Sequence, residues 1–205
     1  ITGFEIGLLD RPPKTVRFHK PVSYAIRRCE FDDYLLRRSD ARLQLGEAVR
    51  EIDRTDDGWI INGSLKARLV IGAGGQLCPV SRQLRKDRGH PAPLVAAVEV
   101  EYPRTGPVAV NGGETQMPRL YFCNDLAGYG WDVAKQDYVN VGIGWVNARD
   151  VPAYWYRLLD RLRSDKVITQ DPPQHTRGHS YHLYEGGSPS VFGDKLLLIG
   201  DSAGL

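Results

Sequence analysis

Residues 94–146 constrain the fold most, because they consist of long strand-like segments with no helix pattern among them. Such segments cover Leu94–Tyr102, Arg119–Cys123, Gly130–Ala134 and Val139–Val146, and glycine and asparagine turns separate them. Strand-forming segments joined by turn residues are typical of antiparallel connections. The sequence therefore predicts a continuous antiparallel sheet over this region.

Two regions on either side of this block are predicted to be strands that run into glycine-rich turns. Leu69–Ile71 reads as a buried strand that ends at Gly72–Gly75, and a short helix is expected near Val80–Lys86. Near the other end, the strand Lys195–Ile199 runs into Gly200–Gly204. Apolar runs followed by glycine favour buried strands that end in tight turns. The expected fold class is therefore α/β (α+β).

Two helices and several short strands complete the expected secondary structure. Cys29–Ser39 has Phe31, Leu35 and Leu36 at helical spacing, and a second helix begins at Asp150 with proline in its first turn. Prolines in residues 1–27 exclude a helix there and leave loops and short strands. The other expected elements are strands at 43–45, 49–52, 59–61 and 181–184, a hairpin turn at 56–58, and buried positions Trp155, Leu158, Leu159 and Leu162 in the second helix.

Charge, cysteine content and hydropathy exclude several classes of protein. A net charge of +2 over 205 residues gives no basis for binding nucleic acid. The three cysteines are odd in number and far apart, which indicates a reducing compartment, and we expect a cytoplasmic protein. No segment has the apolar length of a transmembrane helix. Because the sequence begins at Ile1 and stops just after the Gly-Asp turn, both ends are expected to be cut.

Metal and hydrolase chemistry find no support in the sequence. His175, His179 and His182 lie close along the chain, but strand alternation directs His179 and His182 to opposite faces and no carboxylate has matching spacing. We therefore expect no metal site. The sequence also shows no convincing Ser-His-Asp order, so hydrolase chemistry has no support.

The Gly200–Gly204 turn places a carboxylate where a ligand could reach it. Asp201 follows a buried strand and is flanked by small residues that allow close backbone approach. An aspartate at a strand end suits hydrogen bonding to ligand hydroxyls. A purely structural turn could have the same residues, so the pattern by itself leaves both interpretations open.

Three separated motifs together resemble the FAD-containing aromatic hydroxylase superfamily. They are Arg28-Cys-Glu-Phe-Asp32 at a helix start, Val70–Arg82 with its Gly-Ala-Gly-Gly turn, and Gly200-Asp-Ser-Ala-Gly204. The sheet region narrows the match: Gly128-Tyr-Gly-Trp131, Lys135 and Val139–Gly144 resemble the geranylgeranyl reductase branch, as does the Cys78-Pro79-Val80 step.

The resemblance implies an FAD-dependent oxidoreductase that reduces carbon–carbon double bonds of an isoprenoid, with NAD(P)H or another reductant as electron donor. It implies that residues 1–93 and 185–205 belong to a partial glutathione-reductase-like FAD-binding domain and 94–184 to an antiparallel-sheet substrate domain. The substrate would be small and apolar, and peripheral membrane contact of the intact enzyme is compatible with it. No catalytic residue and no oligomeric state follow from it. The implied cofactor-binding residues are Arg28, Gly72, Ala73, Gly74, Gly75, Gly200, Asp201, Ala203 and Gly204, and the implied substrate-binding residues are Tyr129, Trp131 and Trp145.

Departures from the family pattern and alternative interpretations accompany this assignment. Gly74 replaces the usual aspartate of the first turn, and Val133-Ala134 replaces the usual Phe-Pro. The sequence has no Gly-x-Gly-x-x-Gly motif to bind the pyrophosphate, so these residues alone are not expected to hold FAD.

The alternative functions are those of a flavin monooxygenase or halogenase, and of a non-catalytic sheet domain that binds an apolar ligand. Arg28 could also be an ordinary surface residue, and the aromatic residues ordinary sheet core.

Overall fold

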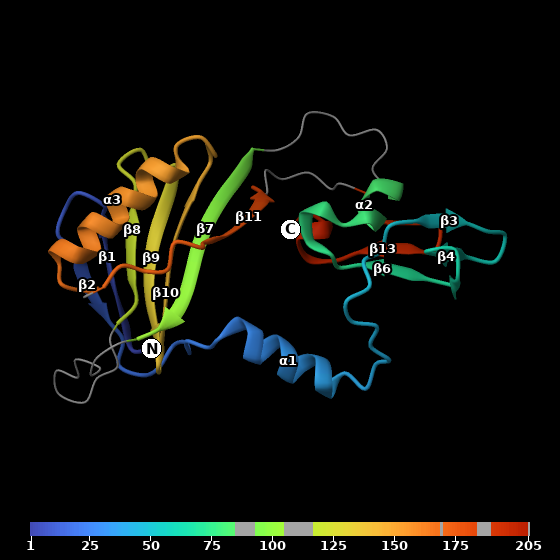
Figure 1. Cartoon of the computed structure of the whole chain (residues 1–205), viewed down its shortest axis with the longest axis horizontal. Helices are drawn as coiled ribbons and strands as arrows, with labels where there is room; N and C mark the ends of the chain where they lie inside the picture. The colour runs from blue at the N-terminus through green and yellow to red at the C-terminus, as the bar shows by residue number, and fades with distance from the viewer. Residues whose placement is uncertain (85–92, 105–116, 169, 184–189, 205) are drawn as a thin grey trace. The chain divides into compact units, whose positions relative to one another are not determined.

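The computed structural model describes residues 1–84, 93–104, 117–168, 170–183 and 190–204. The chain divides into two compact units. Unit 1 comprises Ile1–Ala41 and Ala96–His179, and unit 2 comprises Arg42–Val95 and Ser180–Leu205. Figure 1 labels most of their helices and strands.

Unit 1 is built on a seven-stranded sheet with the strand order β11-β7-β10-β9-β8-β1-β2. Its four central strands, β7, β10, β9 and β8, pair antiparallel, which confirms the sheet predicted for residues 94–146. The strand bounds are β1 Gly3–Leu8, β2 Lys14–Arg17, β7 Leu94–Pro103, β8 Arg119–Phe122, β9 Gly128–Lys135, β10 Tyr138–Trp145 and β11 Arg177–His182.

Helix α3, Val151–Ser164, covers one face of this sheet (Figure 1). Its Leu158 and Leu162 are fully buried and belong to one core with Tyr121, Val141 and Ile143 of the strands. Alternation along β8 and β10 directs these strand residues to the helix side. This core confirms the predicted buried stripe of the helix at Leu158, Leu159 and Leu162; Trp155 is only partly buried against it.

The first forty residues belong to unit 1. They were expected in the same domain as the glycine-rich turns, which lie in unit 2. Strand β1 pairs in parallel with β8, with Gly7 opposite Tyr121, and antiparallel with β2. The expected division at residues 93/94 and 184/185 is corrected accordingly, because these backbone hydrogen bonds tie β1 and β2 to the sheet. Helix α1, Arg28–Arg38, follows and matches the prediction within one residue at each end.

Unit 2 contains two three-stranded sheets, β3-β4-β5 and β12-β13-β6. Trp59, Ile61, Val80, Leu196 and Leu198 are buried in its core. The expected strand at 43–45 is absent, the one at 49–52 is replaced by β3, and β5 was not predicted. The bounds are β3 Ile52–Arg54, β4 Trp59–Ile61, β5 Leu65–Ala67, β6 Val70–Gly72, β12 Phe192–Gly193 and β13 Leu196–Leu198, with helix α2 at Pro79–Leu84 and 3-10 turns η1 at Gly75–Leu77 and η2 at Gly200–Ser202.

Among the described residues, no helix is both long and apolar enough to cross a membrane.

Candidate functional site

The two glycine-rich turns predicted to bind a cofactor lie side by side in unit 2. Strands β6 and β13 are parallel neighbours, with Leu198 opposite Gly72, so their carboxyl ends meet at one edge of the sheet. The Ile199 N–H donates to the Gly72 carbonyl at 3.0 Å, and the Ser202 hydroxyl donates to the Gly75 carbonyl at 3.0 Å. Ligands of open α/β sheets bind beyond the carboxyl ends of the strands. The structure therefore joins the two motifs into one candidate site.

The backbone of both turns is accessible from the outside. Gly75 and Gly200 have φ of 71° and 58°, a conformation that favours glycine, and no atom lies within 4 Å of where a Cβ would stand on either. Gly72 has the opposite role, since a Cβ there would lie 2.7 Å from the Val80 Cβ and 2.8 Å from the Leu198 Cδ2. Gly72 thus packs the strand against its neighbours, while Gly75 and Gly200 leave room for a ligand.

The remaining turn residues divide into exposed and buried positions. Asp201 is exposed at the tip of η2, where its carboxylate is free to accept hydrogen bonds from a ligand. Ala73 and Gly74 are exposed, whereas Ala203 is 1% exposed and packs in the core. A Cβ on Gly74 would lie no closer than 3.4 Å to Cys78. Lack of space therefore does not explain why glycine stands here in place of the aspartate of the family that the motifs resemble. Open glycine backbone beside a strand-end carboxylate fits the phosphates and hydroxyls of a dinucleotide.

Cys78 lies behind the two turns and connects them. The residue is 2% exposed, so its thiol is not a surface group. Burial raises the pKa of the Cys78 thiol, but interactions with the Gly74 backbone, the Ser202 side chain and the backbone of the first turn of α2 lower that pKa by more. The sulfur thus helps hold η1, η2 and the start of α2 in one arrangement.

Arg28 lies in unit 1, at the first residue of α1. Its side chain is 84% exposed and forms an ion pair with Asp32 one helical turn later, at 2.8 Å. An exposed pair of this kind contributes little to stability. Its role in cofactor binding stays a prediction.

The second group of predicted residues lies on the seven-stranded sheet of unit 1. A Cβ on Gly130 would touch Leu158 of α3, so Gly130 faces the helix and its neighbours Tyr129 and Trp131 face away from it. Phe122, Tyr129 and Trp131 form a row, with ring centroids 5.7 and 5.8 Å apart. We call this side of the sheet the aromatic face. Tyr129 and Trp131 thus share one face, as their spacing predicts.

Trp145 does not share that face. In the β9–β10 register it lies opposite Gly128, and its ring stacks on Tyr154 of α3 with centroids 3.8 Å apart. Trp145 is 4% exposed and belongs to the helix-side core. The grouping of Trp145 with Tyr129 and Trp131 as substrate-binding residues is corrected, because strand alternation places Trp145 on the side opposite Trp131.

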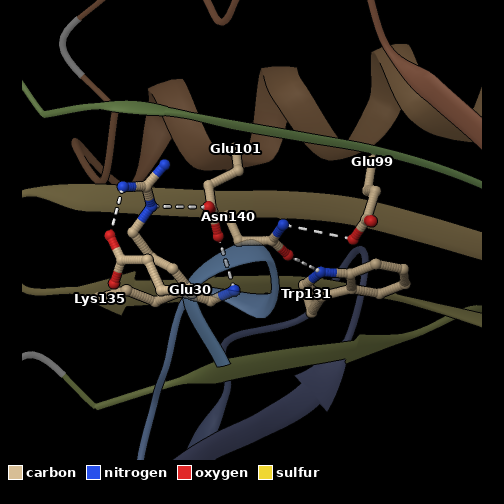
Figure 2. Close-up of polar contacts among 7 residues, drawn as sticks. Glu30, Glu99, Glu101, Trp131, Lys135 and Asn140 are labelled. Atoms are coloured by element: carbon tan, nitrogen blue, oxygen red, sulfur yellow. Dashed lines mark hydrogen bonds and ion pairs between the residues drawn. The ribbon is translucent and has the colours of Figure 1, made fainter. Parts of the chain in front are cut away.

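A polar network on the aromatic face was missed by the sequence analysis (Figure 2). Glu101 accepts hydrogen bonds from Lys135 at 2.7 Å and from Arg27 at 3.1 Å. Burial raises the pKa of Glu101, but the Lys135 ammonium and the Arg27 guanidinium lower it by more. The Trp131 indole N–H donates to Asn140, and Asn140 in turn donates to Glu99. The signal that could have found it is the period-two spacing of Glu99 and Glu101 within an otherwise apolar strand.

The histidines form no metal site in the described part of the chain. There, no group of three or more His, Cys, Asp or Glu side chains could hold a metal ion. His182 lies 3.2 Å from the amide nitrogen of Gln76.

The sequence is similar to that of a digeranylgeranylglycerophospholipid reductase from Methanococcus vannielii, with 26% identity over 209 aligned residues. The match covers 93% of this chain and 50% of the relative, so the chain spans about half the length of the curated relative it matches. No protein-family model matches the sequence.

Solved structures with the same fold include several flavin-dependent enzymes. A flavin-dependent brominase superposes with a TM-score of 0.65 at 14% identity, over 98% of this chain and 55% of its own. The flavin-dependent halogenase CmlS gives 0.61 at 21% identity, over 98% and 41%. Salicylate hydroxylase in a substrate complex gives 0.56 at 15% identity, over 98% and 57%. The chain thus has the fold of the flavin-dependent halogenases and hydroxylases and, as its motifs predict, resembles the geranylgeranyl-reductase-type flavoproteins.

Proposed function

We propose that this chain is the part of an FAD-dependent oxidoreductase that contacts the flavin and the substrate, and that the enzyme reduces double bonds of an isoprenoid. The observation that carries the proposal is the meeting of the two glycine turns at the carboxyl ends of β6 and β13. The FAD would lie against Gly75, Gly200 and Asp201. The sequence similarity to a digeranylgeranylglycerophospholipid reductase, over nearly the whole chain, supports the substrate class.

The chain's own residues have two tasks in this proposal. The turn backbone and Asp201 hold the cofactor through hydrogen bonds, and the aromatic face offers Phe122, Tyr129 and Trp131 as an apolar surface for the prenyl chain. Reduced FAD would supply a hydride to one carbon of the double bond, while a proton reaches the other carbon. We assign no proton donor. NAD(P)H or another reductant would reduce the flavin.

The test uses the protein as its own gene encodes it, purified, reduced with dithionite without oxygen and supplied with a geranylgeranyl lipid. We expect products that have gained one molecule of hydrogen per saturated double bond, detected by mass spectrometry. A Trp131→Ala variant should lose prenyl reduction while keeping its flavin, because Trp131 is only partly buried and lies away from α3. Protein that keeps its flavin and leaves the lipid unchanged would contradict the substrate assignment.

A flavin monooxygenase or halogenase is the second candidate, because the fold neighbours include enzymes of both kinds. Its signature would be a product that gains oxygen or halogen only when oxygen is present. The same reaction mixture, run with and without air, distinguishes the two candidates. If no flavin binds but an apolar ligand does, the chain is a binding domain instead.

A further inference from the structure

The Trp131 indole lies against the sheet over a glycine that makes room for it. Trp131 on β9 pairs with Gly142 on β10. A Cβ on Gly142 would lie 2.2 Å from Cζ2 and 2.5 Å from Cε2 of the ring, closer than side-chain atoms approach one another. The ring therefore occupies the space of the missing side chain. Any larger residue at position 142 would push the indole off the strand.

Asn140 fixes the ring from its nitrogen edge. The indole Nε1–H donates to the Asn140 Oδ1 at 2.6 Å. An indole can only donate at this nitrogen, so it requires an acceptor in that place. Asn140 is 8% exposed, so little water can replace the bond if the ring turns away. The hydrogen bond and the contact with Gly142 together define one orientation of the ring.

Glu99 decides which end of the Asn140 amide faces the ring. The Asn140 Nδ2 donates to the Glu99 Oε2 at 3.3 Å. An ionised carboxylate only accepts hydrogen bonds, so the amide NH₂ must face Glu99 and the oxygen must face Trp131. In a flipped amide, the Asn140 NH₂ would face the indole N–H, which is also a donor. The Asn140 oxygen would then face the Glu99 carboxylate, which is also an acceptor. Figure 2 shows this path from Trp131 through Asn140 to Glu99.

The other charged groups of this face are already paired. Glu101 interacts with both Lys135 and Arg27, and the Arg27 guanidinium also lies 3.6 Å from the centroid of the Tyr138 ring. Arg27 also pairs with Glu30 at 2.6 Å, so the two cations of this group are balanced by two carboxylates other than Glu99. The orientation of the Asn140 amide is thus set by Glu99.

We propose that Asn140, oriented by Glu99, is a positioning residue that holds the Trp131 ring over Gly142, so that Trp131 and Tyr129, whose ring planes are tilted by 49°, together form the apolar contact surface for an extended apolar chain. This inference rests on the proposed function for the identity of the ligand. A Trp131 ring released from Asn140 could turn away from Gly142 and change the shape of this contact surface. The contacts from Glu99 through Asn140 to Trp131 therefore determine which ligand shapes can bind to the aromatic face.

The first measurement follows the Trp131 indole itself. In ¹H–¹⁵N spectra of the purified protein, the Trp131 Nε1–H signal is assigned by its absence in Trp131→Phe. We expect it to exchange slowly with solvent in the wild type and at least 10-fold faster in Asn140→Leu, where the acceptor is lost. Glu99→Gln keeps an acceptor for the amide and should retain slow exchange, while Glu99→Leu should not. Asn124→Leu, which changes an exposed asparagine bonded to Asp10, is the matched control.

Gly142→Ala provides a second route, because it moves the ring while leaving Asn140 and Glu99 intact. It should shift the same signal even if Asn140→Leu fails to fold. An indole signal that stays unchanged in Asn140→Leu or, if that variant does not fold, in Gly142→Ala overturns the inference.

The second measurement is binding of geranylgeraniol, with the KM of prenyl reduction beside it. We expect Asn140→Leu to weaken binding and raise KM roughly 3- to 10-fold, the loss of about one hydrogen bond, with kcat little changed. If the variant binds geranylgeraniol as tightly as the wild type, the positioning inference fails and the proposed function stands. If wild-type protein with intact flavin does not bind geranylgeraniol, the proposed substrate fails, and the indole exchange alone then decides the positioning role.

Discussion

Ser202 makes the hydrogen bond that ties the two glycine turns together, so its removal tests how firmly they are joined. The Ser202 hydroxyl, 1% exposed, donates to the Gly75 carbonyl at 3.0 Å. In Ser202→Ala that bond is lost, but the Gly75 carbonyl still accepts from the Cys78 N–H at 3.0 Å. No buried carbonyl is left without a donor, so the full desolvation penalty does not apply. The expected loss of unfolding free energy is about 1 kcal/mol, the net worth of one hydrogen bond.

Urea unfolding followed by circular dichroism measures this change, with Ser190→Ala as the matched control. Ser190 is an exposed serine of the same unit whose hydroxyl also bonds a backbone carbonyl, at 3.1 Å. Its replacement should alter stability by less than about 0.5 kcal/mol. Hydrogen exchange of peptides that cover 70–84 and 195–204 should rise in Ser202→Ala and not in the control.

Two results would refute this reasoning. If Ser202→Ala matches the Ser190→Ala control in both measurements, the two turns are not held together by this contact. If the loss exceeds about 3 kcal/mol, the Cys78 N–H does not compensate for the missing hydroxyl, and the Gly75 carbonyl is left unsatisfied.

Further predictions concern the buried ion pair and the thiols. Arg119→Met should lower the free energy of unfolding in urea by about 3–5 kcal/mol, because it leaves the 1% exposed Asp132 carboxylate without its cation. The control Arg163→Met removes one partner of an exposed ion pair and should change the stability little. Equal effects of the two variants would argue against a buried pair. Burial raises the pKa of Asp132, so its contribution to stability is fully present below the unfolded value of about 3.9 and is lost as pH rises through the folded pKa. The stability of Asp132→Asn relative to wild type should therefore increase with pH above about 4, and a pH-independent difference would contradict the raised pKa. A thiol reagent should label only the exposed Cys29 in native protein and all three cysteines in denaturant, and rapid native labelling of Cys78 would contradict its burial.

Local sequence signals were sufficient for the elements that depend on short-range patterns. The helix at α1 and the central strands of unit 1 were predicted from apolar spacing and turn residues, and the structure confirms them. The two glycine turns were found because open glycines and a strand-end aspartate are visible as a short motif. Their adjacency depends on the parallel pairing of β6 and β13, more than a hundred residues apart, which no local pattern encodes.

The side of the sheet on which each aromatic residue lies could not be predicted from one strand alone. Tyr129 and Trp131 are two residues apart, so alternation alone places them together. The face of Trp145 depends on the register between β9 and β10, which the tight turn at Gln136 and Asp137 sets. Gln136 has a φ of 51°, a conformation usually marked by glycine or asparagine, and glutamine gives no such signal. The membership of β1 in the sheet was missed for a similar reason, since its parallel partner β8 is distant in sequence.

The most direct test of the account is flavin affinity in Asp201→Ala, measured on the protein as its own gene encodes it. The matched control is Asp194→Ala, which removes an exposed carboxylate of the same unit that pairs with Arg54. Loss of hydrogen bonds from ligand hydroxyls to a carboxylate should weaken flavin binding about 10-fold or more, and the control should bind as the wild type does. If Asp201→Ala retains flavin with unchanged affinity and absorbance, the cofactor does not lie against these turns and the central claim is wrong.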